Sequence, residues 1–431
     1  MTDDVVIVGA SVAGVRTAEA LRRRGFDARI TLIGAEPHLP YDRPPLSKAF
    51  LTGHAAEGDI VLLDGDRLDR LELDLRLGEG AAAVDVATRQ IRLASGEPVP
   101  FGALVIATGS LPRHLPAIDG WPGVHVLRTL DDALAIRAAL AAGARVAVIG
   151  GGFIGAEVAW SARALGLDVA IIDPVSALMA RGLGPALGTV LATRHADHGV
   201  TLRLGRSVAR AEGDGRVERL VLDDGSSLDA DLVVVGIGAD PALGWLASSG
   251  LPVDGGLCCD ASLRVCGTDS VYAVGDVARW PSARYAGPLR LEHWTNAGDS
   301  ALAVAAALTG TAAPFDPLPY VWSDQLGARL QVFGQIRPAD HLLYVEGGPE
   351  EAEFVAACGG DGKLQAVVAL GARRAALRWE RLLRSGLPWI NGHGPAEPAP
   401  LPRARTMVRS VKIFHPNEPG CQPTAIDFTS R

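Results

Sequence analysis

The chain has 431 residues, which at about 150 residues per domain predicts two to three domains. Hydrophobic residues make up 48% and charged residues 21%, a balance typical of globular proteins that excludes a largely disordered chain. Acidic residues number 49 and basic residues 41, which gives a net charge of −8. Because a protein that coats nucleic acid is usually strongly basic, we expect no nucleic-acid partner.

Cysteine usage and hydropathy predict the compartment. The 5 cysteines include no C-x-x-C pair, so neither a disulfide framework nor a zinc or other metal site is expected. A strand pattern begins at Asp4, which leaves no room for a signal peptide. The most apolar run, Ala297–Leu308, is too short to cross a bilayer. Together these observations predict a cytoplasmic protein with no membrane partner.

A strand–turn–helix–strand pattern begins the chain. Asp4–Val8 is a short, β-branched apolar run that predicts a strand, and Gly9 ends it. Ala13–Arg24 predicts a helix with basic residues in its last turn, and Arg29–Ile33 predicts a second strand. This is one βαβ unit, followed by a proline-rich loop over Pro37–Pro45.

A second copy of the pattern begins with a predicted strand over Arg145–Ile149. A turn over Gly150–Gly155, a helix over Ala156–Leu165 and a strand over Asp168–Asp173 follow it. Two such units in one chain indicate two nucleotide-binding domains.

Further segments predict the rest of the fold. Leu104–Gly109, Asp231–Gly238 and Ser270–Asp276 are apolar strands that end at or next to glycine. Aromatic and amphipathic segments from residue 316 to about 390 predict a third, smaller α/β domain. The last forty or so residues are rich in proline and arginine, and the sequence leaves their role open.

The second glycine motif is the more regular one. Gly150, Gly152 and Gly155 form G-x-G-x-x-G after a strand and at the start of a helix. The first glycine permits a tight turn, the second lets the backbone approach a pyrophosphate, and the third lets helix and strand pack closely. Asp173 ends the next strand, where a carboxylate can bind a ribose diol, and its charge favours NADH over NADPH. A tight turn without a ligand is the structural alternative.

The first glycine motif is less regular, because Ser11 stands where the second glycine is expected between Gly9 and Gly14. A small residue still permits approach to a pyrophosphate, and its hydroxyl can donate to a phosphate oxygen. Glu36 is the matching candidate for a ribose acid. A turn of purely structural importance again remains open.

The segment Pro40–Lys48 (PYDRPPLSK) resembles the flavin loop of the putidaredoxin reductase/rubredoxin reductase family, which are FAD-dependent, NADH-linked ferredoxin reductases. Matching segments follow in the family's order: ATG at Ala107–Gly109, GGGFIGAE at Gly150–Glu157, VYAVGD at Val271–Asp276, EHWTNA at Glu292–Ala297 and WSDQ at Trp322–Gln325. The resemblance covers about residues 3 to 390. Its glycine motifs are shared with all flavoproteins that bind two dinucleotides, whereas the loop and the last two segments are specific.

The resemblance implies an α/β fold similar to glutathione reductase, with two Rossmann-type dinucleotide-binding domains and a C-terminal α/β domain. It implies an FAD-binding domain over residues 1–112 and 238–315, and an NAD(H)-binding domain over 113–237. The C-terminal domain is expected over 316–431, with a Pro/Arg-rich tail from about 391. Electrons are expected to pass from NADH through FAD to an iron–sulfur ferredoxin, which supplies a cytochrome P450 or a ring-hydroxylating oxygenase.

The family places its loop lysine near flavin N5, so the resemblance implies that Lys48 is catalytic. Lysine is scarce in this chain, since only Lys363 and Lys412 accompany Lys48. Glu157 is implied to pair with Lys48 and to orient the nicotinamide amide. The structural alternatives are a surface lysine in a proline-rich loop and an acid that only interacts with a helix dipole.

The resemblance also places Arg43 and Arg128 at the FAD pyrophosphate, Asp276 at the ribityl chain, and Trp294 and Trp322 at the flavin. Solvated arginines, a helix-capping acid and core tryptophans are the respective alternatives. The full set of cofactor-binding candidates is Gly9, Ser11, Ala13, Gly14, Glu36, Arg43, Lys48, Ala81, Ala107, Thr108, Gly109, Arg128, Gly150, Gly152, Phe153, Ile154, Gly155, Glu157, Asp173, Gly238, Asp276, Trp294 and Trp322.

The sequence departs from the family at Ser300, where a glutamine is frequent, so one cofactor contact is expected to be absent. His293 is left without a role, because a lone histidine is more often structural. No cysteine lies near Ser47, which argues against the disulfide and peroxide reductases of this fold. The rival from another class is a flavin-bound, NADH-sensing interaction protein that resembles apoptosis-inducing factor. The net charge disfavours it, since DNA binding requires a basic face.

Ferredoxins tend to be acidic, so we expect an arginine-rich docking surface near the exposed flavin edge. The candidates in the C-terminal domain are Arg329, Arg337, Arg373 and Arg374.

Overall fold

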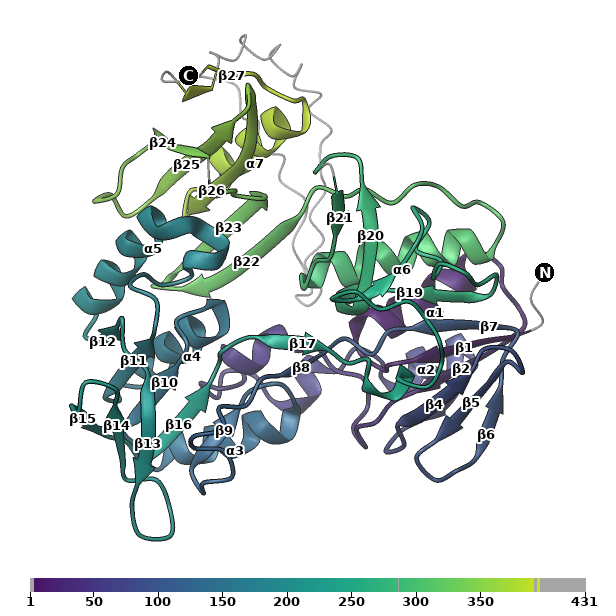
Figure 1. Cartoon of the computed structure of the whole chain (residues 1–431), viewed down its shortest axis with the longest axis horizontal. Helices are drawn as coiled ribbons and strands as arrows, with labels where there is room; N and C mark the ends of the chain where they lie inside the picture. The colour runs from purple at the N-terminus through teal and green to yellow at the C-terminus, as the bar shows by residue number, and fades with distance from the viewer. Residues whose placement is uncertain (1–3, 286, 339, 391–393, 396–431) are drawn as a thin grey trace, which may run out of the picture. The chain divides into compact units, whose positions relative to one another are not determined.

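The computed structural model describes residues 4–285, 287–338, 340–390 and 394–395. Three five-stranded sheets organise this part of the chain (Figure 1). The expected Pro/Arg-rich tail, with Lys412 and Cys421, lies outside the described residues.

The first sheet is parallel and takes its strands from distant parts of the sequence. Its order is β19 (Val271–Ala273), β7 (Ala103–Ile106), β1 (Asp4–Val8), β2 (Arg29–Ile33) and β3 (Leu73–Arg76). Parallel strands covered on both faces are buried, which accounts for the apolar sequences of β1 and β7. Helices α1 (Val12–Arg23) and α6 (Trp294–Leu308) pack side by side in the same hydrophobic core.

An antiparallel meander joins this core. It consists of β4 (Ala81–Asp85), β5 (Gln90–Leu93) and β6 (Pro98–Pro100). Val84, Ile91 and Val99 alternate with exposed neighbours, so one face of the meander is buried and the other is solvated.

The second sheet repeats the parallel arrangement with strands from one continuous stretch of chain. Its order is β12 (Thr201–Leu204), β11 (Val169–Asp173), β10 (Val146–Ile149), β16 (Leu232–Val235) and β9 (Val124–Val126). Helices α3 (Leu130–Ala141), α4 (Phe153–Ala164) and α5 (Ala180–Asp197) contact its strands. A second meander, β13 (Val208–Glu212), β14 (Arg219–Leu222) and β15 (Ser227–Asp229), lies between β12 and β16 in the sequence.

The third sheet is antiparallel and lies in the C-terminal part of the described chain. Its order is β22 (Tyr320–Gln325), β23 (Ala328–Gly334), β26 (Lys363–Leu370), β25 (Phe354–Gly360) and β24 (His341–Glu346). Helix α7 (Arg373–Arg384) packs on β26 and β23 through the apolar side chains Ala376, Trp379 and Leu383. The expected third region is therefore present, with antiparallel strands and one helix.

A short two-stranded ribbon joins the first two sheets. β8 (Ser110–Pro112) follows β7, and β17 (Ala239–Pro241) follows β16, and the two strands pair antiparallel. The chain therefore leaves the first sheet and returns to it through neighbouring segments. The smaller elements are η1 (Pro44–Ser47), η2 (Glu57–Ile60), α2 (Gly65–Leu71), η3 (Gly244–Leu246), β18 (Leu257–Cys258), η4 (Gly275–Val277), β20 (Ala278–Ser282), β21 (Gly287–Leu289), β27 (Trp389–Ile390) and β28 (Gly394–Pro395).

Several element boundaries differ from the expectations. α4 begins at Phe153 rather than Ala156, because the last glycine of the motif, Gly155, already lies inside the helix. α1 likewise begins at Val12, one residue early. The three apolar runs predicted as long strands form the shorter β7, β16 and β19, because their final residues turn the chain away from the sheet. At Gly275 this turn requires a φ of +69°, which favours glycine.

The run Ala297–Leu308 belongs to α6, in the core of the first sheet. Within the described residues, no helix has the length and apolar character that a bilayer crossing requires. The four cysteines of that part, Cys258, Cys259, Cys266 and Cys358, are free thiols.

Candidate active site

One cavity of about 900 Å³ brings the sequence motifs together. Its lining comes from the carboxyl ends of β1, β2, β7, β10 and β16, from the Pro40–Lys48 loop and from β22 of the third sheet. Ligands of open α/β sheets bind at this edge. Of the candidates from the sequence, the following line the cavity: Gly9, Ser11, Ala13, Glu36, Arg43, Lys48, Ala81, Ala107, Thr108, Gly109, Arg128, Gly150, Gly152, Phe153, Ile154, Gly155, Glu157, Asp173, Gly238, Asp276, Trp294 and Trp322.

Gly14 is the candidate that does not line the cavity. A Cβ atom there would lie 2.0 Å from the carbonyl oxygen of Gly9, so the residue lets α1 pack closely under the turn. A Cβ atom added to Gly155 would likewise lie 2.0 Å from the carbonyl oxygen of Gly150. The third glycine of each motif therefore serves helix–turn packing, as its position predicts.

Both turns also need glycine at their first position. Gly9 has a φ of +118° and Gly150 a φ of +103°. A Cβ atom added to Gly9 would lie 2.1 Å from the carbonyl oxygen of Ala107, and one added to Gly150 would lie 2.3 Å from that of Gly236. Ser11 and Gly152 are the N-cap residues of α1 and α4. The Ser11 hydroxyl makes no capping hydrogen bond, and Gly152 has no side chain to make one. The first backbone N–H groups of both helices thus remain available to a bound anion.

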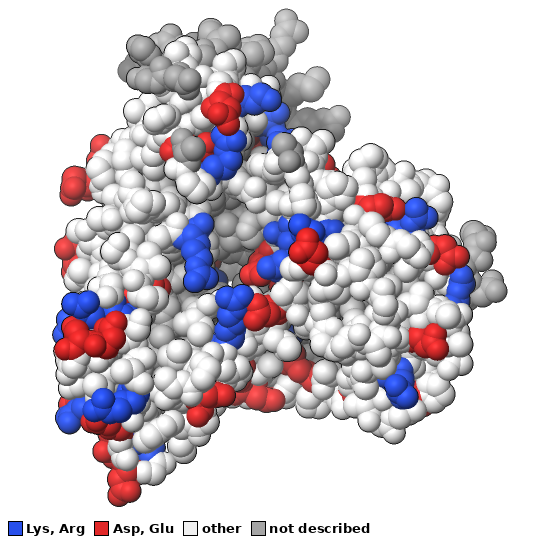
Figure 2. Space-filling view, viewed as in Figure 1, with Lys and Arg blue, Asp and Glu red and all other residues white. Residues whose placement is uncertain are grey.

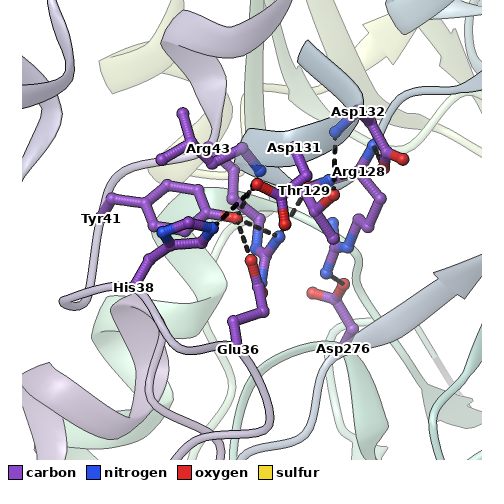
Figure 3. A network of polar contacts seen from close by, with 10 residues as sticks. Glu36, His38, Tyr41, Arg43, Arg128, Thr129, Asp131, Asp132 and Asp276 are labelled. Atoms are coloured by element: carbon purple, nitrogen blue, oxygen red, sulfur yellow. Dashed lines mark hydrogen bonds and ion pairs between the residues drawn. The ribbon is translucent and has the colours of Figure 1, made fainter. Parts of the chain in front are cut away.

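Glu36 belongs to a network of polar side chains (Figure 3). Its carboxylate accepts hydrogen bonds from Nη2 of Arg43 at 2.7 Å and from the hydroxyl of Tyr41 at 2.5 Å. That hydroxyl in turn accepts the backbone N–H of Leu130 at 2.9 Å. Burial raises the pKa of Tyr41, so the phenol stays neutral and donates to Glu36.

Two guanidinium groups lie close together in the same network (Figure 3). Arg43 donates through Nη1 to the carbonyl oxygen of Arg128 at 2.5 Å, and burial together with the nearby Arg43 charge lowers the pKa of Arg128. Nη2 of Arg128 lies 3.8 Å from Oδ2 of Asp276, which also accepts the hydroxyl of Ser110 at 2.8 Å.

Nε of Arg43 is buried and has no partner within the described residues. A buried donor without a partner, next to the second, partly buried guanidinium of Arg128, is costly unless an anion lies between them. This part of the cavity therefore fits a pyrophosphate.

Asp173, the second candidate ribose acid, is held by backbone groups. Its Oδ2 accepts the N–H of Gly151 at 2.6 Å, and its Oδ1 accepts the N–H of Val175 at 2.7 Å. Arg181 lines the cavity nearby. The carboxylate is thus fixed at the end of β11 before any ligand binds.

Lys48 and Glu157 form an ion pair at 2.7 Å in the cavity wall. The Glu157 side chain is only 2% exposed and that of Lys48 is 17% exposed. Oε2 of Glu157 also accepts the hydroxyl of Ser47 at 2.5 Å, and Oε1 accepts the hydroxyl of Ser323 at 2.6 Å. Lys48 is therefore not a free surface lysine. Glu157 interacts with specific side chains and not only with the dipole of its helix.

Aromatic side chains form another part of the wall. Trp294 donates through Nε1 to Oδ1 of Asp42 at 2.6 Å, and its ring meets Trp322 edge-on with centroids 5.7 Å apart. Tyr320 stacks on Trp322 at 5.9 Å. Both tryptophans line the cavity and are incompletely buried, so neither is an ordinary core residue.

The sequence reasoning did not identify several residues of the site. Tyr41 and Ser47 lie inside the PYDRPPLSK segment, and Ser323 inside WSDQ, but only the fold shows their contacts. His293 lines the cavity, and burial lowers its pKa to about 4. Ser300 is fully buried, and its hydroxyl oxygen accepts the N–H of Gly275 at 3.0 Å. It therefore stabilises the turn before Asp276.

Residues 3–301 match the family model of the pyridine nucleotide-disulphide oxidoreductases, and residues 320–391 match the reductase C-terminal model. The chain belongs to the pyridine nucleotide-disulphide oxidoreductase family. This membership and the mixed α/β architecture confirm the expected fold.

Similar proteins within this family cover nearly the whole chain. Rhodocoxin reductase of Rhodococcus erythropolis is 36% identical over 89% of this chain and 90% of its own length. The ferredoxin–NAD(+) reductase component of the anthranilate 1,2-dioxygenase system of Burkholderia cepacia is 39% identical over 89% of this chain and 95% of its own. The crystal structure of the covalent putidaredoxin reductase–putidaredoxin complex superposes with a TM-score of 0.86 at 32% identity, covering 90% of this chain and 94% of the other.

Proposed function

We propose that this protein is an FAD-dependent ferredoxin–NAD(+) reductase. The observation that carries the proposal is that both phosphate-binding turns and the buried Lys48–Glu157 pair open onto one cavity. The similar proteins include ferredoxin–NAD(+) reductase components of dioxygenase systems. The two family models that the chain matches also support the proposal.

The residues present fit the two cofactors. The turn at Gly9, with Arg43 and Arg128, would hold the FAD pyrophosphate, and the unpartnered Nε of Arg43 is the group that such an anion would satisfy. The turn at Gly150 would hold the NADH pyrophosphate, with Asp173 at the ribose. When bound, FAD supplies a ring that takes two electrons from NADH and releases them one at a time.

The chain's own residues would orient the reactants and stabilise charge. Lys48 brings a cation into the wall, where it favours added negative charge on a bound ring, and Glu157 holds that cation in place. The N-terminus of α6 begins at Trp294 on the cavity, so its dipole favours negative charge at the same place. Trp294 and Trp322 cover apolar surface and keep water from it.

The overall reaction balances with a one-electron partner. One NADH gives two electrons and a proton as hydride, and two oxidised [2Fe–2S] ferredoxins take one electron each, leaving NAD(+), a proton and two reduced ferredoxins. The reduced ferredoxin would then supply a cytochrome P450 or a ring-hydroxylating oxygenase. On the face in Figure 2, acidic and basic side chains are interspersed, which suits a small protein partner better than nucleic acid.

The division into domains belongs to the same proposal. An FAD-binding domain over 1–112 and 238–315 and an NAD(H)-binding domain over 113–237 agree with the strand composition of the first two sheets and with the β8–β17 ribbon between them. A C-terminal domain from residue 316 agrees with the third sheet. A cytoplasmic location remains a prediction, which cell fractionation would test.

The experiment is NADH-dependent reduction of cytochrome c by the purified yellow protein, with and without a [2Fe–2S] ferredoxin. We expect a rate that depends on ferredoxin. A protein that purifies without flavin, even after incubation with FAD, would overturn the proposal. Flavin reduction by NADH without any gain from a panel of ferredoxins would instead favour the rival, a flavin-bound NADH-sensing interaction protein.

The docking hypothesis changes with the structure. Arg329 pairs with Asp324, and Arg337 pairs with Asp340 and Asp361, so their charges are largely compensated. Arg373 and Arg374 are exposed at the start of α7. We therefore expect these two to contribute more to an acidic partner's docking.

Reversing Arg373 and Arg374 to glutamate should raise the KM for ferredoxin about tenfold, and leave NADH oxidation by ferricyanide unchanged. Reversing the compensated Arg337 is the matched control. Equal losses of both activities in the Arg373/Arg374 variant would contradict docking at α7.

A further inference from the structure

A buried row of side chains leads from α5 to Glu157. Nε2 of His195 lies 2.8 Å from Oε1 of Gln325, and Nε2 of Gln325 lies 2.9 Å from the hydroxyl oxygen of Ser323. The hydroxyl of Ser323 donates to Oε1 of Glu157 at 2.6 Å. His195 and Ser323 are 0% exposed and Gln325 is 1% exposed, so no bulk water competes for these bonds.

The chemistry of the groups fixes the direction of every bond in the row. A carboxylate only accepts, so Ser323 must give its one proton to Glu157. The hydroxyl oxygen of Ser323 can then accept from Gln325, which turns the amide NH₂ towards Ser323 and the amide oxygen towards His195. His195 must therefore carry its proton on Nε2. Burial lowers the pKa of His195, which keeps the ring neutral.

The row joins parts of the fold that are separate in sequence. His195 lies on α5 of the second sheet, and Gln325 and Ser323 lie on one face of β22 in the third sheet. Glu157 lies on α4, and its other oxygen accepts from Ser47 and Lys48. One carboxylate is thus held by donors from the loop between β2 and β3 of the first sheet, on one side, and from the third sheet, on the other.

Reversing the Gln325 amide would disconnect the row. The amide oxygen would then face Ser323 and compete with Glu157 for its single proton, and the NH₂ group would face the N–H of His195. Ser323, which gives its proton to Glu157, therefore selects the amide orientation with NH₂ towards Ser323. His195 then secures that orientation by donating its Nε2–H to the amide oxygen. Nδ1 of His195 has no partner within the described residues, so the imidazole has Gln325 as its polar contact there.

We propose that His195, Gln325 and Ser323 are positioning residues that keep the Glu157 carboxylate turned so that it holds Lys48 in the cavity wall. The inference rests on the proposed function, because it assigns the row to the reduction of bound flavin by NADH. None of the three residues lines the cavity, so they act through Glu157.

The sharpest test is Gln325→Glu, which keeps the shape of the side chain but replaces the donor NH₂ with an acceptor oxygen. Ser323 would then donate to residue 325, and Glu157 would lose a hydrogen bond. We expect flavin reduction at saturating NADH to slow by about tenfold to a hundredfold, while dithionite reduces the flavin as before. Gln365→Glu on β26 of the same sheet is the matched control, since Gln365 makes only a 3.5 Å contact with a backbone oxygen.

A KM-against-kcat split distinguishes positioning from general damage. The rate at saturating NADH should fall in Gln325→Glu, with the flavin content unchanged. Rates equal to those of Gln365→Glu would overturn the proposal. If Gln325→Glu does not fold, the comparison passes to Ser323→Ala and Ser323→Thr: a slow alanine variant rescued by threonine supports the row, and two normal rates overturn it.

A second measurement does not depend on turnover. ¹⁵N NMR of histidine-labelled protein, with His195→Asn to assign the signal, should show a neutral ring protonated on Nε2. A ring protonated on Nδ1, or a charged ring, would overturn the row whatever the enzyme does. The opposite result is also informative. If NADH fails to reduce the flavin of the wild-type protein but the His195 signal is as expected, the proposed function is refuted and the row of hydrogen bonds stands.

Discussion

The turn at Gly9 beside the first sheet and the turn at Gly150 beside the second have nearly the same backbone, with φ angles of +118° and +103°. In both turns, a Cβ atom added to the third glycine would lie 2.0 Å from the carbonyl oxygen of the first glycine. The acids that follow differ. Glu36 is held by side chains, Arg43 and Tyr41, whereas Asp173 is held by backbone N–H groups.

The difference shows what each half of the cavity depends on. Asp173 is fixed by the turn itself, so the second half is complete within one βαβ unit. Glu36 is fixed by the Pro40–Lys48 loop, which in turn contacts the segment around Arg128. The first half therefore depends on parts of the chain that are far apart.

The largest effects should come from closing each turn. Gly14→Ala should give protein without flavin, because α1 must move away from Gly9. Gly155→Ala should retain flavin but slow its reduction by NADH by at least about a hundredfold, because only the second turn is displaced. Flavin absorbance per chain, followed by anaerobic reduction with NADH and with dithionite, measures both.

Gly298→Ala is the control, since this α6 glycine has room for a methyl group. The alanine should stabilise the helix by about 0.5–1 kcal/mol. If Gly155→Ala lost flavin and Gly14→Ala kept it, the assignment of the two turns would be reversed.

The next largest effect concerns the ion pair that links the two halves. Glu157→Leu should lower the free energy of unfolding by about 3–5 kcal/mol, because it leaves the largely buried charge of Lys48 without its carboxylate partner. The double variant Lys48→Met/Glu157→Leu should be less destabilised than Glu157→Leu alone. Urea unfolding of the flavin-free protein measures both.

Asp240→Ala, which breaks the exposed pair with Arg113, should have a much smaller effect on the same scale. A double variant as unstable as the sum of its two single variants would show that the Lys48–Glu157 contact contributes nothing.

The two halves of the cavity should lose stability at different pH values. His293 lies in the half of the cavity that we propose binds flavin, and burial lowers its pKa from 6.5 to about 4. The neutral imidazole therefore favours the folded state above about pH 6.5. That stability is lost as the pH falls towards 4. The loss amounts to at most about 3 kcal/mol. The hydrogen bond from Arg145 lowers the pKa of Asp231, in the second half, from 3.8 to about 2, so its contribution is lost only below about pH 4.

Flavin release should therefore precede loss of secondary structure as the pH falls. Flavin fluorescence and far-ultraviolet circular dichroism follow the two events. His293→Gln should lower the pH of flavin release, and Asp231→Asn should not move it. Release at the same pH in wild type and His293→Gln would exclude His293 as the cause.

The smallest effect should be on nucleotide choice. Asp173→Asn keeps the shape of the side chain but removes the charge that repels a 2′-phosphate, so the ratio of kcat/KM for NADH over NADPH should fall about tenfold. Glu36→Gln, its counterpart in the first half, should leave this ratio unchanged. An unchanged ratio in Asp173→Asn would remove that residue from coenzyme selection.

Sequence patterns predicted the backbone of the site better than its side-chain contacts. Glycine at a turn is required by local φ angles and close approach, so Gly9 and Gly150 can be read from spacing. Lys48 and Glu157 were paired only by family resemblance. Nothing local distinguishes Ser323 or His195, because their roles depend on the packing of the second sheet against the third.

Strand composition has a further consequence for how this chain is made. All five strands of the second sheet have been synthesised once Val235 emerges, but the first sheet lacks β19, Val271–Ala273, until later. The second sheet can therefore close first during synthesis. Until then β7 has an unpaired edge, which is prone to intermolecular pairing. We expect flavin loading to wait as well, because Asp276, which we propose binds the flavin, emerges just after that strand.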